Sequence, residues 1–149
     1  MRGVKRRTLL QSILTAALVP PRAWAIEVAS GGRGEGLTAM VYELRVYHAS
    51  PGKMGDLLAR FRDHTVKLFD RHGMKSVAYW NPVDEPEKSN TLIYILQHPS
   101  REAAAANWKA FQDDPEWKIV KEKSEANGKL TVKIDSTFLE LTDFSPSPK

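Results

Sequence analysis

The first strong pattern in the chain is an alternation of side chains that begins at Met40. Between Met40 and His48, successive residues are expected to point to opposite sides, as they do in a β-strand. One side carries Tyr42, Leu44 and Val46, and the other carries Val41, Glu43, Arg45 and Tyr47. Apolar side chains therefore occupy both sides, and the second side also holds one acid and one base.

A helical repeat follows the turn at Pro51-Gly52 and continues to His72. Its members fall on one stripe when the chain advances by about 100° per residue. They are Met54, Leu57, Leu58, Phe61, Thr65, Leu68 and His72. Gly73 is expected to end this helix, because the residue after a helix often adopts a left-handed conformation that glycine tolerates.

The remainder of the domain predicts three more strands and two more helices. The strands are expected at Met74–Asn81, Thr91–His98 and Lys133–Leu141, and a polar connection joins the first two as a hairpin. Ser100 is a candidate N-cap for a helix to about Gln112, and Asp114-Pro115 predicts a short helix that Asn127-Gly128 closes. The order β-α-β-β-α-α-β predicts an α+β fold, the ferredoxin-like split βαβ plait, with helices on one face of a four-stranded antiparallel sheet.

Both faces of the predicted sheet carry large apolar side chains, although helices cover only one. The opposed sets are Trp80 against Val77 and Tyr79, Ile93 and Ile95 against Leu92, Tyr94 and Leu96, and Phe138 against Leu139 and Leu141. An exposed apolar face of this size is typical of an interface. We therefore expect a homodimer in which two sheets face each other and form a shared α/β barrel.

The first 25 residues have the composition of an export signal. A basic run ends at Arg6-Arg7, an uncharged stretch covers Thr8–Val19, and Ala23-Trp24-Ala25 fits a cleavage site. The arginine pair resembles a twin-arginine signal, which predicts a periplasmic protein cleaved after Ala25; the alternative is a basic amphipathic helix. Residues 26–39 are rich in glycine and are interpreted as a flexible leader, which leaves residues 40–146 as the folded domain. The uncharged stretch is too short to cross a bilayer.

Removal of this segment changes the charge of the protein. The full chain of 149 residues has 22 basic and 18 acidic residues, a formal net charge of +4. Five of the basic residues lie in the first 25 positions, so residues 26–149 carry 17 basic and 18 acidic groups, a net charge of −1. A nearly neutral domain argues against nucleic-acid binding. The chain has no cysteine, which excludes disulfides and thiolate chemistry.

Several blocks of sequence follow one another in an order typical of a known family. They are Tyr42-Glu43-Leu44-Arg45-Val46-Tyr47, Pro51-Gly52-Lys53-Met54, His64, Leu68-Phe69-Asp70-Arg71-His72-Gly73-Met74, Ala78-Tyr79-Trp80-Asn81-Pro82, Phe111-Gln112-Asp113-Asp114-Pro115-Glu116-Trp117 and Thr142-Asp143-Phe144-Ser145-Pro146. These blocks resemble the NIPSNAP family of the dimeric α/β-barrel superfamily. The resemblance spans about residues 40–146. It implies the fold more than a reaction, because the family has no agreed activity and relatives on this fold include small monooxygenases and haem-binding enzymes. The export signal and single domain differ from animal members, so their organelle roles are not carried over.

Glu43 and Arg45 form the first candidate site. Two charged side chains on an otherwise apolar strand face are costly to bury unless they form an ion pair or serve a function. If that face lines the barrel, Arg45 holds an anionic ligand, and Glu43 either orients Arg45 or acts as a base. The alternative is a structural ion pair or a pair at the dimer interface.

Two histidines on the first predicted helix are further candidates. His64 and His72 are eight residues apart, which is too far for a shared metal ion, and no other metal site is predicted. His64 is a candidate base or haem ligand at the barrel mouth, with packing as the alternative. His72 is a candidate ligand-binding residue or, as the plainer interpretation, a packing histidine at the C-terminal turn, where the helix dipole favours a cation.

Aromatic residues supply candidate walls for a flat ligand. Trp80, Tyr79 and Tyr94, together with Tyr47, could stack on such a ligand, while packing in the core or the dimer interface is the alternative. Trp108, Phe111 and Trp117 are interpreted as core residues. The charged run Lys118, Lys121, Glu122, Lys123 and Glu125 is interpreted as a solvated helix face.

Two functional hypotheses follow. The first is an exported dimer that binds a small ligand or a partner protein without catalysis. The second is a cofactor-free or haem-assisted monooxygenase for an aromatic or hydrophobic substrate, with Arg45 as anion holder, His64 as base or ligand, and Trp80 and Tyr94 as walls. The residues themselves do not identify a cofactor.

Overall fold

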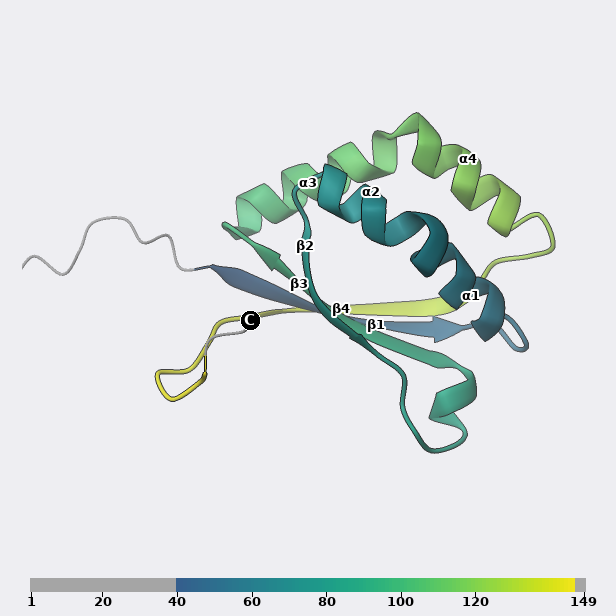
Figure 1. Cartoon of the computed structure of the whole chain (residues 1–149), viewed down its shortest axis with the longest axis horizontal. Helices are drawn as coiled ribbons and strands as arrows, with labels where there is room; N and C mark the ends of the chain where they lie inside the picture. Colours follow the sequence, from purple (N-terminus) through teal and green to yellow (C-terminus); the bar gives the residue numbers. More distant parts are fainter. Residues whose placement is uncertain (1–39, 147–149) are drawn as a thin grey trace, which may run out of the picture. The chain divides into compact units, whose positions relative to one another are not determined.

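The computed structural model describes residues 40–146, which form one sheet with a layer of helices (Figure 1). The element order is β1 (Val41–Ala49), α1 (Met54–Arg60), η1 (Phe61–Thr65), α2 (Val66–Arg71), β2 (Lys75–Trp80), η2 (Glu87–Ser89), β3 (Thr91–His98), α3 (Arg101–Asp113), α4 (Pro115–Ser124) and β4 (Thr131–Leu139). The predicted signal segment, the glycine-rich leader and residues 147–149 lie outside the described residues.

The sheet has the order β2-β3-β1-β4, and every neighbouring pair is antiparallel. The long helices all lie on one face of it (Figure 1). This arrangement confirms the predicted ferredoxin-like plait. The predicted last strand was misplaced by two residues at each end, because it runs over Thr131–Leu139 rather than Lys133–Leu141.

The first helix is not uniform, contrary to the single helix predicted from its stripe. It is α-helical to Arg60, passes through a π-helical turn over Phe61–Thr65, and becomes α-helical again at Val66. The wider turn is closed by the bond from the Val66 N–H to the Phe61 carbonyl and by the Thr65 hydroxyl, which donates to the Arg60 carbonyl at 3.2 Å. Such turns insert one extra residue and are frequent at functional sites.

The helix ends follow the capping residues that the sequence predicts. The Ser100 hydroxyl accepts the Ala103 N–H at 3.1 Å, and the Asp114 carboxylate accepts the Glu116 N–H at 2.7 Å. Gly73 has a φ of +71° directly after the first helix. A left-handed conformation there explains why glycine is suited to the position.

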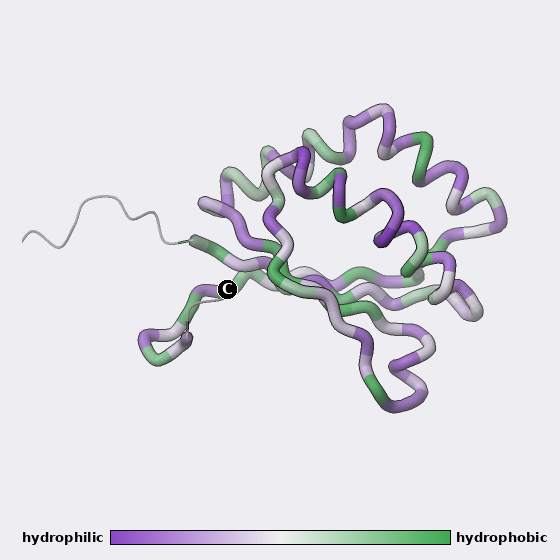
Figure 2. Tube along the Cα trace, in the orientation of Figure 1, coloured by the Kyte–Doolittle hydropathy of each residue, from purple (hydrophilic) through white to green (hydrophobic). Residues whose placement is uncertain are grey.

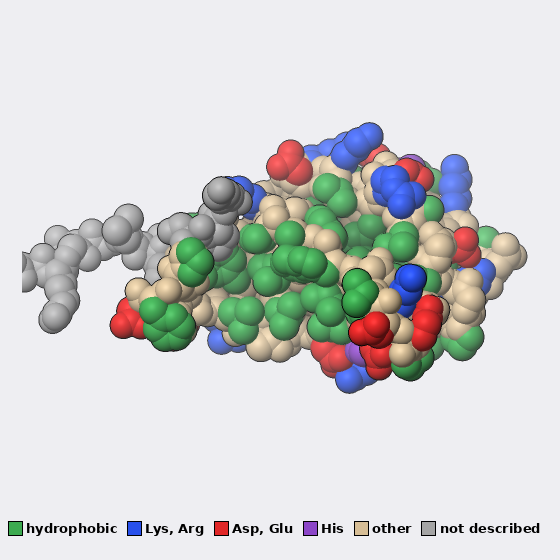
Figure 3. All heavy atoms as spheres, turned by 60° about the horizontal axis from the view of Figure 1, so that its bottom comes forward, with side chains coloured by type: hydrophobic (Ala, Val, Ile, Leu, Met, Phe, Trp, Pro, Cys, Tyr) green, Lys and Arg blue, Asp and Glu red, His purple; other side chains and the backbone are tan. Residues whose placement is uncertain are grey.

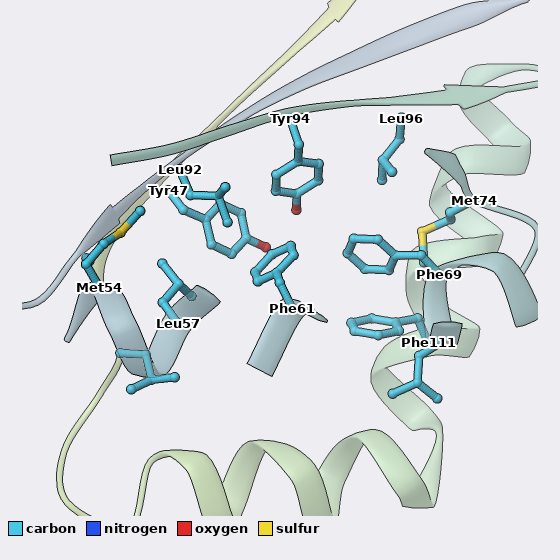
Figure 4. Packing of buried hydrophobic residues seen from close by; sticks show 13 residues of the cluster. Tyr47, Met54, Leu57, Phe61, Phe69, Met74, Leu92, Tyr94, Leu96 and Phe111 are labelled. Carbon is cyan, nitrogen blue, oxygen red and sulfur yellow. The ribbon is translucent and has the colours of Figure 1, made fainter. Parts of the chain in front are cut away.

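The core lies between the sheet and the helices and is rich in aromatic rings. Figure 4 shows Tyr47 and Tyr94 from the sheet meeting Phe61, Phe69 and Phe111 from the helices. The ring centroids of Tyr47 and Phe61 are 5.5 Å apart, and those of Phe69 and Phe111 are 5.0 Å apart. These separations are within the range in which aromatic pairs attract each other.

The other face of the sheet is covered by no α-helix among the described residues, although its side chains are also apolar. Strand alternation and register place on it Leu44, Val46, Ile93, Ile95 and Trp80, which we call the open face. The Trp80 side chain is 46% exposed. Figure 3 shows hydrophobic side chains gathered over this side of the molecule, and Figure 2 shows hydrophobic residues recurring along both the strands and the helices.

No helix within residues 40–146 has the length and apolar character needed to cross a membrane.

Candidate functional site

A cavity of about 700 Å³ opens between the sheet and the helices. Arg45, Tyr47, Thr131 and Ile134 line it from the strands. The helices and the segment after α4 contribute most of the rest, including Phe61, Phe69, Trp108, Phe111, Trp117, Arg60, Lys118, Lys121, Glu125 and Lys129. Aromatic walls combined with a few charged groups are typical of a site for a small organic molecule.

Arg45 lies within this cavity and is 16% exposed. Its Nη1 donates to Glu43 Oε1 at 2.8 Å. The guanidinium carbon is 4.4 Å from the centroid of the Trp108 ring and 5.7 Å from that of Tyr47. Because an ion pair and two aromatic rings hold it, this guanidinium has little freedom to move, and it presents a fixed positive charge to the cavity.

Glu43 is the anchor of this arrangement and is 2% exposed. Its carboxylate accepts four side-chain hydrogen bonds: from Trp108 Nε1 at 2.6 Å, Ser136 Oγ at 2.7 Å, Arg45 Nη1 at 2.8 Å and His98 Nε2 at 3.2 Å. Burial alone raises the pKa of Glu43, but the bonds from His98, Ser136 and Trp108 and the charge of Arg45 outweigh it and lower the pKa to about 2. Glu43 therefore stays ionised near neutral pH and holds Arg45.

The part of the sequence that forms this site matches a known protein family. The family model described as NIPSNAP matches residues 42–146, which is most of the chain and includes every residue of the cavity. The chain belongs to the NIPSNAP family. A search of curated proteins finds no match.

Solved NIPSNAP structures have the same fold as this chain. One is an uncharacterized NIPSNAP-like domain protein from Burkholderia xenovorans, with 19% identity, a TM-score of 0.64, and coverage of 75% of this chain and 93% of that one. Another is a NIPSNAP family protein of unknown function from Agrobacterium tumefaciens, with 20% identity, a TM-score of 0.63, and coverage of 75% and 96%. At these identities the likeness establishes the fold alone.

In this NIPSNAP domain, the face of β1 that carries Glu43 and Arg45 is the one covered by the helices. The hypothesis from the sequence had placed this face on the barrel side of the sheet. Instead, it packs beneath the helices, where Glu43 meets Trp108 of α3, and it does not belong to the open face. Of the two roles considered for Glu43, its four bonds support the orientation of Arg45. They argue against a general base, because a carboxylate with a pKa of about 2 has little affinity for a proton.

The two candidate histidines of the first helix do not join this site. His64 is exposed in a neighbouring groove beside α4 that shares Arg60 with the cavity, and it is not among the residues that line the cavity around Arg45. The Nε2 atom of His72 lies 2.7 Å from Asp114 Oδ2, next to the N-terminus of α4. This contact supports the plainer interpretation of His72, a packing histidine at the end of a helix.

The predicted aromatic walls divide between three places. Tyr47 lines the cavity, Trp80 lies on the open face, and Tyr79 stacks on Tyr94 with centroids 5.4 Å apart. Tyr94 is completely buried, and burial raises the pKa of its hydroxyl well above the ordinary value. Trp80 and Tyr94 therefore do not line this cavity.

Two residues interpreted as core pack against the core, as predicted, and are also part of the site. Trp108 and Trp117 are only partly buried and line the cavity, whereas Phe111 is buried and also contacts it. The signal for Trp108 is chemical, because a partly buried indole N–H usually finds an acceptor, and Glu43 is that acceptor.

His98 and Ser136 were also missed. Both lie on strands that flank β1, on the same face as Glu43.

The charged run is a largely solvated face, as predicted, because four of its five members are exposed. Lys118, Lys121 and Glu125 line the cavity, and Glu125 Oε1 accepts Arg60 Nη1 at 3.0 Å. Within residues 40–146, no group of three or more histidines and acidic residues is placed to hold a metal ion.

Proposed function

We propose that this NIPSNAP protein binds a small organic anion with an aromatic or apolar body, in the cavity between the sheet and the helices, without chemical turnover. The observation that carries this proposal is the Arg45 guanidinium, which Glu43 fixes and Trp108 stacks upon inside an aromatic cavity. A guanidinium held in this way suits a carboxylate, which it binds through paired hydrogen bonds.

The hydrogen-bonding capacity of Arg45 supports the same proposal. Its Nη1 is engaged by Glu43, whereas its Nε is buried and has no acceptor among the described residues. A buried donor without an acceptor is costly, so an anionic oxygen that reached Nε would gain a charge-assisted bond. The aromatic rings around it favour a ligand with a flat apolar body.

The state of the acidic groups supports binding without turnover. Glu43 is committed to four donors, and Glu125, the acid in the cavity lining, is paired with Arg60. General acid–base catalysis needs a group with a pKa near the working pH and free access to substrate. His64, which the oxygenase hypothesis required, lies in another groove, so no observation favours that hypothesis.

We further propose that the protein acts as a homodimer closed over the open face. This face is supported as an interface by its apolar composition, with Leu44, Val46, Ile93, Ile95 and Trp80 on adjacent strands. Surfaces of this kind seldom remain in contact with water. At one end of the sheet, His48 and Lys133 pair with Asp135 at 3.0 and 2.9 Å, which gives the face a polar margin.

We also propose that the protein is exported to the periplasm. The pair Arg6-Arg7 and the sequence Ala23-Trp24-Ala25 support delivery to the periplasm by the twin-arginine route. Mass spectrometry of the exported protein tests this, with Ile26 expected as the first residue. A full-length exported chain, or a first residue far from Ile26, would contradict it.

The binding proposal is tested by thermal unfolding with matched ligands. Naphthoate and naphthamide share one aromatic body and differ in charge, and a ligand that binds only the folded state raises its unfolding temperature. Naphthoate is expected to stabilise the protein at concentrations where naphthamide does not. Equal effects of the two compounds, or no effect of either, would overturn the proposal.

A further inference from the structure

The cavity that contains Arg45 has a second concentration of positive charge. Its described lining contains five cationic side chains, Arg45, Arg60, Lys118, Lys121 and Lys129, against one carboxylate, that of Glu125. Arg45 projects from β1, whereas Arg60 ends α1, Lys118 and Lys121 belong to α4, and Lys129 precedes β4. The other four cations therefore come from the helices and the segment after α4, and not from the strand that carries Arg45.

Arg60 is the buried member of these four, with a side chain that is 5% exposed. Its Nη1 donates to Glu125 Oε1 at 3.0 Å and to Ser124 Oγ at 3.3 Å, and its guanidinium carbon is 5.2 Å from the Trp117 ring. Its Nε is buried and has no acceptor within residues 40–146. Arg60 thus has an unused donor, and buried donors gain most from an anionic acceptor.

The π-helical turn lies next to this cation in the sequence and in the cavity lining. It begins directly after Arg60, and the Thr65 hydroxyl donates a hydrogen bond to the Arg60 carbonyl. Arg60, Phe61 and Thr65 all line the cavity. The irregular turn of the first helix is therefore also the part of that helix that borders the cavity.

We propose that the ligand of this cavity is a dianion, with two anionic groups joined by an apolar body. One group is bound by Arg45 on the sheet, and the other by Arg60 together with Lys118 and Lys121 on the helical side. This inference rests on the proposed function, because it names the class of anion that the same cavity takes. Glu125 is the competing carboxylate at the second position, since it already pairs with Arg60.

The experiment compares two ligands with one body by titration calorimetry at low ionic strength, where charges on a cavity rim are least screened. One ligand is naphthoate, and the other is a naphthalene dicarboxylate with its carboxylates at opposite ends of the long axis. A second charge-assisted contact is expected to strengthen binding by about tenfold or more. The dicarboxylate is therefore expected to bind at least about tenfold more tightly than naphthoate.

Substitutions then locate the second anionic group. The double variant Lys118→Gln/Lys121→Gln, which changes exposed residues and should fold normally, is expected to weaken binding of the dicarboxylate by a larger factor than binding of naphthoate. Glu125→Gln removes the competing carboxylate and should strengthen the dicarboxylate more than naphthoate. Lys67→Gln changes an exposed lysine of α2 outside the cavity lining and serves as the matched control.

Three results would overturn the inference, and they show which part of it fails. If naphthoate binds but the dicarboxylate binds no more tightly, or if the lysine double variant weakens both ligands equally, the dianion is wrong while the anion site remains. If neither ligand binds, the proposed function fails and the dianion fails with it.

Discussion

The indole Nε1 of Trp108 donates a hydrogen bond of 2.6 Å to Glu43 Oε2, across 65 residues of sequence. This bond joins α3 to the centre of the sheet, because Glu43 lies on β1, which has a strand on each side. The same indole ring lies against the Arg45 guanidinium. One tryptophan therefore fixes both members of the Glu43–Arg45 pair.

Removal of the Glu43 charge is expected to destabilise the domain strongly. Glu43→Gln leaves Arg45 without its buried counter-ion, and loss of one partner of a buried pair costs about 3–5 kcal/mol. Denaturant unfolding measures the change in the free energy of unfolding. Glu122→Gln, an exposed position on α4, is the control and should change this free energy by less than about 0.5 kcal/mol. Similar values for the two variants would show that the Glu43 contacts contribute little.

The acid dependence of stability follows from the pKa of Glu43. This pKa falls from 4.5 to about 2 on folding, so the carboxylate stabilises the folded state at pH values above its ordinary pKa. That contribution, on the order of 3 kcal/mol, is lost as the pH falls from about 4.5 to about 2.

Urea unfolding across this pH range tests the dependence. The difference in unfolding free energy between the wild type and Glu43→Gln should stay constant above about pH 5 and shrink below it. The other acids with lowered pKa values, such as Asp135, are present in both proteins and cancel in the difference. A difference that does not change with pH would contradict the assignment of four donors to an ionised Glu43.

Trp108→Phe separates the hydrogen bond from aromatic packing. Phenylalanine keeps a ring against Arg45 but donates nothing to Glu43, and a bond to a charged group contributes about 2 kcal/mol. The variant should lose about that much stability and bind naphthoate more weakly. Trp117→Phe is the matched control, since Trp117 lines the same cavity and its loss removes no bond to Glu43. Equal losses of stability in the two variants would mean that packing alone explains Trp108.

The proposed dimer is tested by charge placed on the open face. Ile95→Arg should yield a monomer, because an unpaired guanidinium is costly to bury in an apolar interface. Ile119→Arg, on the helical side at α4 and 52% exposed, should leave the dimer intact. Sedimentation velocity at micromolar concentration measures the mass of each. A monomeric wild-type protein, or a dimer that tolerates arginine at position 95, would contradict the proposed interface.

The architecture was predictable from the sequence because its signals are local. Alternation of apolar residues predicted β1 and β3 nearly residue for residue. The capping residues Ser100 and Asp114 predicted the starts of α3 and α4, and Gly73 predicted the end of the first helix. The π-helical turn was not predictable from the stripe, because Phe61, Thr65 and Leu68 have the spacing of an uninterrupted α-helix. The last strand was misplaced because β4 is an edge strand with mostly exposed side chains and a weak apolar pattern.

The site was predictable only in part, because its contacts are distant in sequence. The Glu43–Arg45 pair was evident as two charges on an apolar strand, but which face of the sheet the helices cover could not be decided when both faces are apolar. The partners of Glu43 come from β3, α3 and β4. His64 and Trp80 belong to other surfaces of the molecule, and residue type alone could not distinguish them from cavity residues.

The central claim is that Arg45 makes this cavity selective for anions, and calorimetry on Arg45→Met tests it most directly. Methionine keeps an unbranched apolar side chain and removes the charge, and Lys67→Gln controls for loss of a surface charge. The wild type and Lys67→Gln are expected to bind naphthoate at least about tenfold more tightly than naphthamide, because one charge-assisted contact changes the affinity by about that factor. Arg45→Met should bind naphthoate at least about tenfold more weakly than the wild type and lose most of the preference over naphthamide. A folded Arg45→Met protein that still prefers naphthoate by the wild-type ratio would contradict the claim.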